Sequence, residues 1–159
     1  MEDSKVPLEQ FLKEELIKLH LVCDSQDQLF DIMYEEAFKR GYVSESFIGK
    51  IKEREAVFPT GLNMNNYNVA IPHTDPECVF EQFIGVVTLE KPVPFRLMDD
   101  NTQEVDVNVV LMLGLNQPHS QLAVLQQLMQ VIQDENNIEQ ILQAETSKDI
   151  HSIFNKLEV

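Results

Sequence analysis

The stretch Val105-Asp-Val-Asn-Val-Val-Leu-Met-Leu-Gly-Leu115 carries the strongest strand signal in this 159-residue sequence. Apolar residues alternate with polar ones in its first half, and its second half is continuously apolar, which is typical of a strand buried on both faces. From about Ser120 onward, apolar residues recur at the spacing of one helix face. A buried strand that leads into an amphipathic helix predicts a sheet covered by helices.

Two further apolar runs predict strands of the same sheet. The run from Phe83 to Leu89 is rich in β-branched residues and is typical of a buried strand. The run from Asn68 to Ile71 is shorter and is followed by Pro72, which pushes the residue before it toward extended geometry. Pro92 and Pro94 limit the segment after Leu89 to a sheet edge or a loop.

Helical patterns precede these strands in the sequence. Asp24 or Ser25 can cap a helix that ends at Gly41, which supplies a stop. Ser44 can cap a second helix from Glu45 to about Val57. Both segments space their apolar residues so that one face of the helix is buried.

The end of the chain adds two shorter helices, and its start fits two structures. A helix is predicted from Ile138 to Ala144, and Thr146-Ser-Lys-Asp149 resembles a capping box that opens a last short helix. Residues 8–20 fit a helix or a strand. Helices, then strands, then helices predict an α/β or α+β fold whose sheet is covered on both faces, and we expect residues 1–159 to form one domain.

The composition indicates a globular chain with a strong negative charge. The hydrophobic share is 43%, Trp is absent, and the formal net charge is −15. This charge disfavours nucleic acids and anionic membrane surfaces, because each phosphate contact needs Lys or Arg. We therefore expect no nucleic-acid partner and, since no apolar run approaches the length of a bilayer span, no direct membrane insertion.

The expected location is cytoplasmic. The N-terminal Met-Glu-Asp-Ser-Lys has no basic region followed by an apolar stretch, so it does not resemble a secretion signal. Cys23 and Cys78 are far apart and form no Cys-x-x-Cys pair. In a reducing compartment both are expected to be free thiols, with a shared disulfide as the alternative.

His73 and His119 are the histidines with an informative context, because each follows a predicted strand. Sites in sheets of this kind gather outside the strand ends, and the helix start near His119 adds free N–H groups that favour an anion. Neutral imidazole is a nucleophile near pH 7, and the guanidinium of Arg54 can fork onto phosphate oxygens. The pattern fits a phosphohistidine site. The alternatives are structural or exposed histidines and an Arg54 paired with Glu53 or Glu55.

Two motifs at a fixed separation carry a resemblance to a known family. They are Arg54-Glu-Ala-Val-Phe-Pro-Thr-Gly-Leu62 and Asn68-Val-Ala-Ile-Pro-His73. The sequence resembles the enzyme IIA domain of the bacterial phosphoenolpyruvate-dependent sugar phosphotransferase system, in the fructose–mannitol class, over nearly the whole chain. Within that class it looks most similar to the galactitol-type IIA proteins. The resemblance implies an α/β fold with a mixed β-sheet sandwiched by helices on both faces.

The resemblance also implies a chemistry and a set of partners. His73 would be phosphorylated by the histidine-containing phosphocarrier protein (HPr) and would pass the phosphoryl group to a cysteine of a IIB component, serving a IIC permease indirectly. Arg54 would lie beside the phosphohistidine, and Thr60 would shape the loop. No metal or organic cofactor is required.

The sequence departs from the family pattern at two places. The register of the family's second active-site histidine falls on Gln121, whereas His119 lies two residues earlier. His119 reaching the site from the loop and Gln121 donating a hydrogen bond are the two interpretations. Asn66 and Tyr67 stand where some relatives carry a glycine and an acidic residue.

Three rival interpretations compete with a transport component. A metal site would use His73, Asp75, Glu77 and Cys78, with Asp99-Asp100 nearby, but the spacing matches no familiar zinc motif, and turn formers explain these aspartates better. A regulatory module would bind partner proteins according to the phosphorylation of the same histidine. An inert interaction domain would leave His73 idle.

Overall fold

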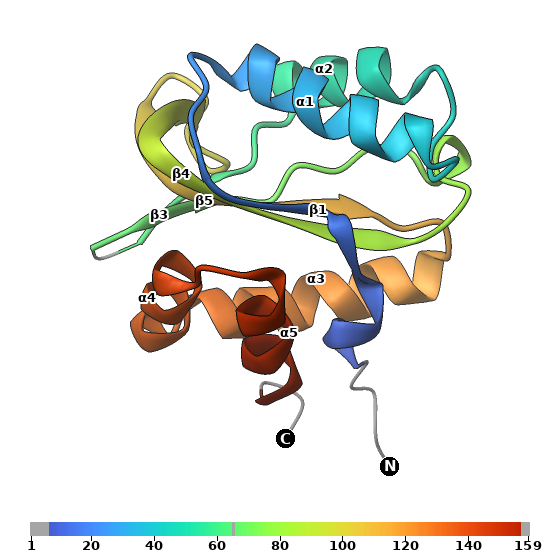
Figure 1. The fold of residues 1–159 in the computed structure, drawn as a ribbon. Helices are drawn as coiled ribbons and strands as arrows, with labels where there is room; N and C mark the ends of the chain where they lie inside the picture. Colours follow the sequence, from blue (N-terminus) through green and yellow to red (C-terminus); the bar gives the residue numbers. More distant parts are fainter. Residues whose placement is uncertain (1–6, 65, 157–159) are drawn as a thin grey trace.

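The computed structural model describes residues 7–64 and 66–156 of the chain. Its centre is a mixed five-stranded sheet in the order β1-β4-β5-β3-β2 (Figure 1). The strands are β1 (Leu12–Leu21), β2 (Gly61–Asn63), β3 (Asn68–Ala70), β4 (Phe83–Arg96) and β5 (Glu104–Gly114). β5 lies in the middle, antiparallel to β4 and parallel to β3. The apolar run that predicted a buried strand therefore forms the central strand.

Helices cover both faces of the sheet, as the sequence predicted (Figure 1). Figure 1 places α1 (Gln26–Lys39) and α2 (Phe47–Val57) on one face, and α3 (Pro118–Ile132), α4 (Glu135–Gln143) and α5 (Ser147–Lys156) on the other. Short 3-10 helices η1 (Leu8–Phe11) and η2 (Pro76–Cys78) complete the described elements. The fold is α/β.

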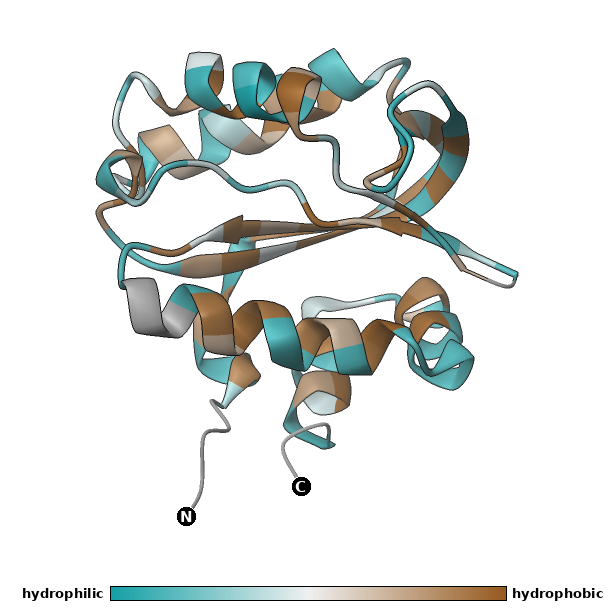
Figure 2. Cartoon of the chain, turned by 180° about the vertical axis from the view of Figure 1, so that it is seen from behind, coloured by the Kyte–Doolittle hydropathy of each residue, from teal (hydrophilic) through white to brown (hydrophobic). Residues whose placement is uncertain are grey.

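Alternating side chains of the strands divide the core into two layers. Val110 of β5 belongs to the cluster under α1 and α2, with Met33 and Phe47, whereas Leu111 belongs to the cluster under α3 to α5, with Leu128. In Figure 2 the strands are largely apolar, and the helices mix apolar and hydrophilic turns. Successive residues of a strand point to opposite faces, so the continuously apolar half of β5 supplies both layers.

Several local expectations are confirmed. The Ser25 hydroxyl accepts the Gln28 N–H at 3.1 Å at the start of α1, and Gly41 follows that helix with φ of +78°. Thr146 and Asp149 form the capping box: the Thr146 hydroxyl accepts the Asp149 N–H, and the Asp149 carboxylate accepts the Thr146 N–H, each at 3.2 Å. Of the ambiguous residues 8–20, residues 8–11 form the 3-10 helix η1 and residues 12–20 belong to strand β1.

The proline-containing end of β4 lies at an edge of the sheet. After an irregularity between Thr88 and Val93, residues 93–96 pair with β5, while the pairing of β1 with β4 ends at Leu89. Pro94 has no N–H to donate, and its place on a strand end paired on one side leaves no ladder bond missing there. The edge interpretation of this segment is correct.

Two predicted helix starts are wrong. α2 begins at Phe47 rather than Glu45, because the Ser44 carbonyl accepts the Phe47 N–H at 3.1 Å in a tight turn before the helix. α3 begins at Pro118, so His119 lies in its first turn instead of before it. Proline suits that first position because its φ is already helical and its missing N–H would have no partner there.

Cys23 and Cys78 are both buried and free, so the described structure contains no disulfide between them. Within residues 7–64 and 66–156, no helix combines the length and the hydropathy needed to cross a membrane.

Candidate functional site

His73 lies at the end of the sheet where β3 stops and the chain leaves β5. The Leu113 N–H donates to the Pro72 carbonyl at 2.9 Å, and His73 forms a parallel bridge with Leu113. Because β3 and β5 are parallel, their C-terminal ends share this edge. The chain that follows β5 enters α3 at Pro118, on the same side. The strand pairing therefore brings the residues after β3 and the start of α3 to one end of the sheet.

One hydrogen bond determines the tautomer of the His73 ring. Nδ1 lies 2.9 Å from the carbonyl oxygen of Ile71. A carbonyl oxygen only accepts, so Nδ1 carries the proton in the neutral ring and Nε2 keeps its lone pair. Among the described residues, no hydrogen bond joins Nε2 of this half-buried ring to a partner. Nε2 is thus the nitrogen available for nucleophilic chemistry.

The surroundings of His73 favour the neutral imidazole. Desolvation by burial lowers its pKa below the usual 6.5, and the positive charge of Arg54 lowers it further, while the hydrogen bond to Ile71 acts in the opposite direction. A lowered pKa keeps the imidazole unprotonated at pH 7. The lone pair on Nε2 is then present without a general base.

Arg54 reaches this site from the last turns of α2. Its guanidinium carbon lies 5.2 Å from the centre of the Phe58 ring, and its Nε is buried without a hydrogen-bond partner among residues 7–64 and 66–156. Within the described residues no ion pair joins it to Glu53 or Glu55, so the alternative of a solvated helix pair does not hold. A buried unsatisfied donor costs about 1–3 kcal/mol.

Thr60 and Glu55 link the helix of Arg54 to the strand of His73. Both are buried, at 2% and 4% exposure. The Thr60 N–H donates to the Glu55 carboxylate at 2.7 Å, and the Thr60 hydroxyl does so at 2.9 Å. The Thr60 carbonyl in turn accepts the Ile71 N–H at 3.3 Å. Thr60 therefore connects the end of α2 to the end of β3, and its role at the site stays a prediction.

Glu55 is a residue that the sequence reasoning missed, having considered it only as a partner for Arg54. Burial raises the pKa of its carboxyl, and the two hydrogen bonds from Thr60 partly oppose that effect. The signal was present in the helix spacing: Glu55 lies four residues after Ile51 and eight after Phe47, both fully buried. Positions four apart share a helix face, which puts Glu55 on the inward side.

A shallow depression of about 180 Å³ lies beside Arg54. It is lined by residues of α2 and of the loop after His73: Lys50, Glu53, Arg54, Val57, Phe58, Thr74 and Asp75. The Lys50 ammonium lies 3.8 Å from the Asp75 carboxylate across it. The depression offers a second cation, Lys50, and two exposed apolar side chains, Val57 and Phe58, next to Arg54.

The two candidates for the second site residue are placed less fully. His119 is in the first turn of α3, but its side chain lies outside the described residues. Gln121 is half-buried in the same turn, and no hydrogen bond joins its side chain to another described residue. Both remain predictions for the site.

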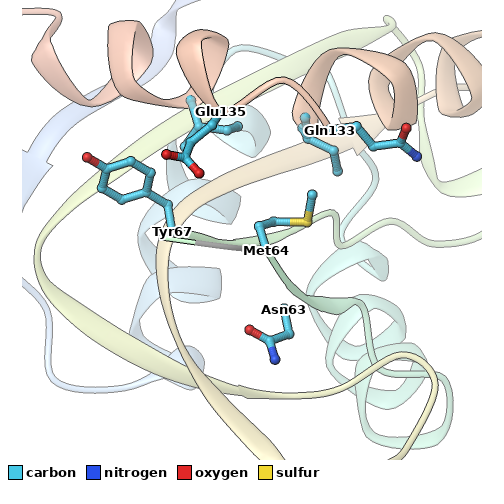
Figure 3. Close-up of a pocket in the computed structure, with 7 residues that line it drawn as sticks. Asn63, Met64, Tyr67, Gln133 and Glu135 are labelled. Carbon is cyan, nitrogen blue, oxygen red and sulfur yellow. The ribbon is translucent and has the colours of Figure 1, made fainter.

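Asn66 and Tyr67, which replace a glycine and an acidic residue of some relatives, form hydrogen bonds with α4. The Asn66 side-chain amide donates to the carboxylate of Glu135, and the Tyr67 hydroxyl donates to the carboxylate of Glu139 at 3.5 Å. Both glutamates belong to α4. Figure 3 shows Tyr67, Met64 and Glu135 around a pocket of about 140 Å³ between the β2–β3 turn and α4. None of the predicted site residues lines this pocket.

The residues of the proposed metal alternative do not come together. Among the described side chains, no group of three or more His, Cys, Asp and Glu is placed to hold a metal ion. Cys78 is buried, and Asp75 faces Lys50. Asp100 accepts the N–H and hydroxyl of Thr102 at 3.1 and 2.6 Å, which is the turn chemistry expected for that loop.

The chain belongs to the EIIA 2 family of the phosphoenolpyruvate-dependent sugar phosphotransferase system, whose family model matches residues 10–157. It is thus a sugar phosphotransferase component of the IIA type. A mannitol-specific phosphotransferase enzyme IIA component of Bacillus subtilis is 30% identical over 93% of this chain and 99% of its own length. A galactitol-specific EIIA component of Escherichia coli is 28% identical over 67% of this chain and 71% of its own.

Other similarities widen the family. A nitrogen regulatory protein of Klebsiella oxytoca is 27% identical over 96% of this chain and 92% of its own length. The fold is that of the nitrogen regulatory protein IIA-Ntr of Neisseria meningitidis, with a TM-score of 0.77 at 21% identity over 92% and 97% of the two chains. The fold is also that of the mannitol enzyme IIA from Escherichia coli, which was solved in complex with phosphorylated enzyme IIB. That comparison has a TM-score of 0.71 at 21% identity and covers 91% of this chain and 97% of the other.

Proposed function

We propose that this chain is a phosphoryl carrier that takes the phosphoryl group of phospho-HPr onto Nε2 of His73 and passes it to a cysteine of a IIB component. One observation supports the proposal. A neutral imidazole, whose Nδ1 donates to the Ile71 carbonyl, lies within the electrostatic influence of Arg54, whose buried Nε has no hydrogen-bond partner among the described residues. Such a carrier would work in the cytoplasm, where the family's phosphocarrier partners act.

The transfer needs no cofactor in this chain. The Nε2 lone pair forms the new bond to phosphorus as the bond to the donor imidazole of HPr breaks, and that electron pair returns to the donor ring. In the second step a IIB thiolate attacks the same phosphorus, and the pair returns to Nε2. The Nδ1–H stays bonded to Ile71 throughout, so the ring keeps one orientation.

Arg54 is proposed to stabilise the charge on the phosphoryl oxygens during both steps. Its buried Nε gains the acceptor that it lacks in the free protein, and the guanidinium remains stacked on Phe58. Gln121 or His119 is proposed to contact the group from the start of α3, where unpaired N–H groups also favour an anion. Thr60 supports the site through its loop.

The substrate class that we propose is a sugar or sugar alcohol. Relatives with mannitol and galactitol in their names both match, and the mannitol-specific relative covers more of this chain than the galactitol-specific one. The likeness to the galactitol type therefore does not select the sugar. Mannitol-like and galactitol-like permeases are to be tested side by side.

A regulatory role is the second candidate. The similarity to a nitrogen regulatory protein supports it, because the same phosphohistidine would then control binding to partner proteins. Neighbouring genes for IIB and IIC proteins would favour transport, whereas a lone gene beside regulatory genes would favour regulation.

Incubation of the full chain with phosphoenolpyruvate, enzyme I and HPr tests the proposal. We expect one acid-labile phosphate per chain, and none in His73→Ala. Arg54→Gln is expected to slow acceptance by roughly 10²-fold, since it removes a preorganised charge at the transferring group. Replacing His119 or Gln121 in turn should slow transfer without abolishing it.

His151→Gln is the matched control, because His151 is half-buried in α5 and pairs with Glu9 on the opposite face of the sheet. It should be phosphorylated at the wild-type rate. Phosphate retained by His73→Ala, or lost equally in His151→Gln, would rule out His73 as the acceptor.

A further inference from the structure

Glu55 is a buried carboxylate to which the transfer chemistry gives no role. Its exposure is 4%, and both of its oxygens are engaged by Thr60, the N–H at 2.7 Å and the hydroxyl at 2.9 and 3.1 Å. Desolvation raises the pKa of this carboxyl, so burial opposes its charge. The chain thus buries a carboxylate at a cost in free energy and places the N–H and the hydroxyl of Thr60 where both donate to it.

The hydrogen bonds continue from Glu55 to the imidazole through two peptide units. Thr60 donates to Glu55, and the Thr60 carbonyl accepts the Ile71 N–H at 3.3 Å. The Ile71 carbonyl accepts Nδ1–H of His73 at 2.9 Å. The group that fixes the tautomer of the ring is thus tied, one residue at a time, to the Glu55 side chain.

Glu55 also follows Arg54 directly in α2. The same side chain that holds Thr60 therefore fixes the helix end from which Arg54 reaches His73. In the part of the chain that the structure describes, no hydrogen bond from Nε holds Arg54, and Phe58, the ring under its guanidinium, is 62% exposed. The position of the cation relative to the imidazole then depends on how firmly the end of α2 is attached to the strand.

We propose that Glu55 is a positioning residue for phosphoryl transfer: by accepting the N–H and hydroxyl of Thr60, it fixes Arg54 and His73 relative to each other. The inference rests on the proposed function and adds to it a residue that contacts neither phosphorus nor the imidazole. It acts through Thr60 and Ile71. Small errors in placement are costly in such sites, where a 1 Å displacement can lower the rate by about 10²-fold.

Two variants remove the link at different points. Glu55→Gln replaces one acceptor oxygen by an amide that cannot accept, and Thr60→Val removes only the hydroxyl. Each is measured for the single-turnover rate of phosphoryl acceptance from phospho-HPr per folded molecule, and for the pKa and tautomer of His73 by ¹H–¹⁵N NMR of the unphosphorylated chain. We expect a 10- to 100-fold slower step at saturating donor in Glu55→Gln, a smaller loss in Thr60→Val, and a shifted His73 titration in both.

Matched controls make the same chemical changes elsewhere. Glu36→Gln alters a half-buried carboxylate of α1 that pairs with Lys18, and Thr88→Val removes a buried hydroxyl that accepts the His20 N–H at 2.8 Å. Both should lower the free energy of unfolding yet leave the acceptance rate per folded molecule and the His73 titration unchanged. These readouts separate positioning from a merely structural role.

A folded Glu55→Gln with wild-type rate and wild-type His73 titration would overturn the inference. Should Glu55→Gln not fold, Thr60→Val decides by the same two readouts. The proposed function fails separately: a wild-type chain that takes no phosphate while Glu55→Gln still shifts the His73 titration would refute the carrier role and keep the link to the imidazole. A wild-type chain that is phosphorylated and indifferent to both variants would refute the positioning role alone.

Discussion

Gly61 follows Thr60 at the start of β2, where the sheet leaves no room for a side chain. A Cβ there would lie 2.5 Å from the carbonyl oxygen of Arg96 and 3.2 Å from the Cβ of Phe95. The oxygen belongs to the backbone and cannot rotate away. Gly61 is also held on two sides, because it pairs with Ala70 and its carbonyl accepts the Met98 N–H at 2.8 Å. Gly61→Ala must therefore displace paired backbone.

The expected magnitude follows from overpacking and from the unfolded chain. Forcing extra volume into a packed site costs about 1–3 kcal/mol, and replacing glycine returns about 0.4–1 kcal/mol by restricting the unfolded state. The middle of these two ranges gives a net loss of about 1–2 kcal/mol, and for a chain of this size each kcal/mol lowers Tm by about 2–4 °C. We expect a Tm that is about 2–8 °C lower, together with slower phosphoryl acceptance because Thr60 is adjacent.

Gly49→Ala is the internal control for this reasoning. Gly49 is exposed within α2, and a Cβ there would meet nothing within 4 Å. Alanine should stabilise the helix by about 0.5–1 kcal/mol, so the Tm should rise. Thermal unfolding followed by circular dichroism, supported by urea titration, compares the two variants. A Gly61→Ala protein as stable as wild type, or a pair of variants that shift in the same direction, would refute the argument from contact distances.

Two further predictions concern protonation and capping. The rate of phosphoryl acceptance should fall on acidification with a midpoint below 6.5, because burial and Arg54 lower the pKa of His73. By linkage, the stability that His73 contributes is present above its unfolded pKa and is lost as the pH falls through the folded pKa, so urea titrations from pH 7.5 downward should show a steeper loss for wild type than for His73→Ala. Ser25→Ala should lower the free energy of unfolding by about 1 kcal/mol, because the hydroxyl caps α1 through the Gln28 N–H, and urea titration at pH 7 measures it.

Local patterns predicted most of the elements, because their causes lie within a few residues. The apolar run of β5, the cap at Ser25 and the box at Thr146 each act over one turn or one strand. Residues 8–20 were ambiguous because polar and apolar residues mix there without a clean period. The parallel pairing of β1 with β4 decides the structure from Leu12 onward. That pairing joins segments about seventy residues apart, so local spacing does not contain it.

The site was predictable to the extent that its residues carry side-chain chemistry. His73, Arg54 and Thr60 were named from motifs, and the structure brings them together at the end of β3. What links them is mostly backbone: the carbonyls of Thr60 and Ile71 accept regardless of side chain. Glu55 was missed because an Arg-Glu pair in a helix suggests a surface ion pair, whereas its burial depends on the fold of the following loop.

The hydrogen bonds between Glu55, Thr60, Ile71 and His73 explain why the β2–β3 hairpin can differ from the family pattern without a change at the imidazole. The link passes from Thr60 directly to Ile71, so the β2–β3 hairpin between them (residues 61–64 and 66–70) is not part of it. At the far end of the hairpin Asn66 and Tyr67 contact α4, on the other face of the sheet from Arg54. We expect a substitution in this hairpin to affect the site only if it breaks the hydrogen bond between Thr60 and Ile71. Changes at Glu55 or Thr60 act on it directly, although neither side chain touches the ring.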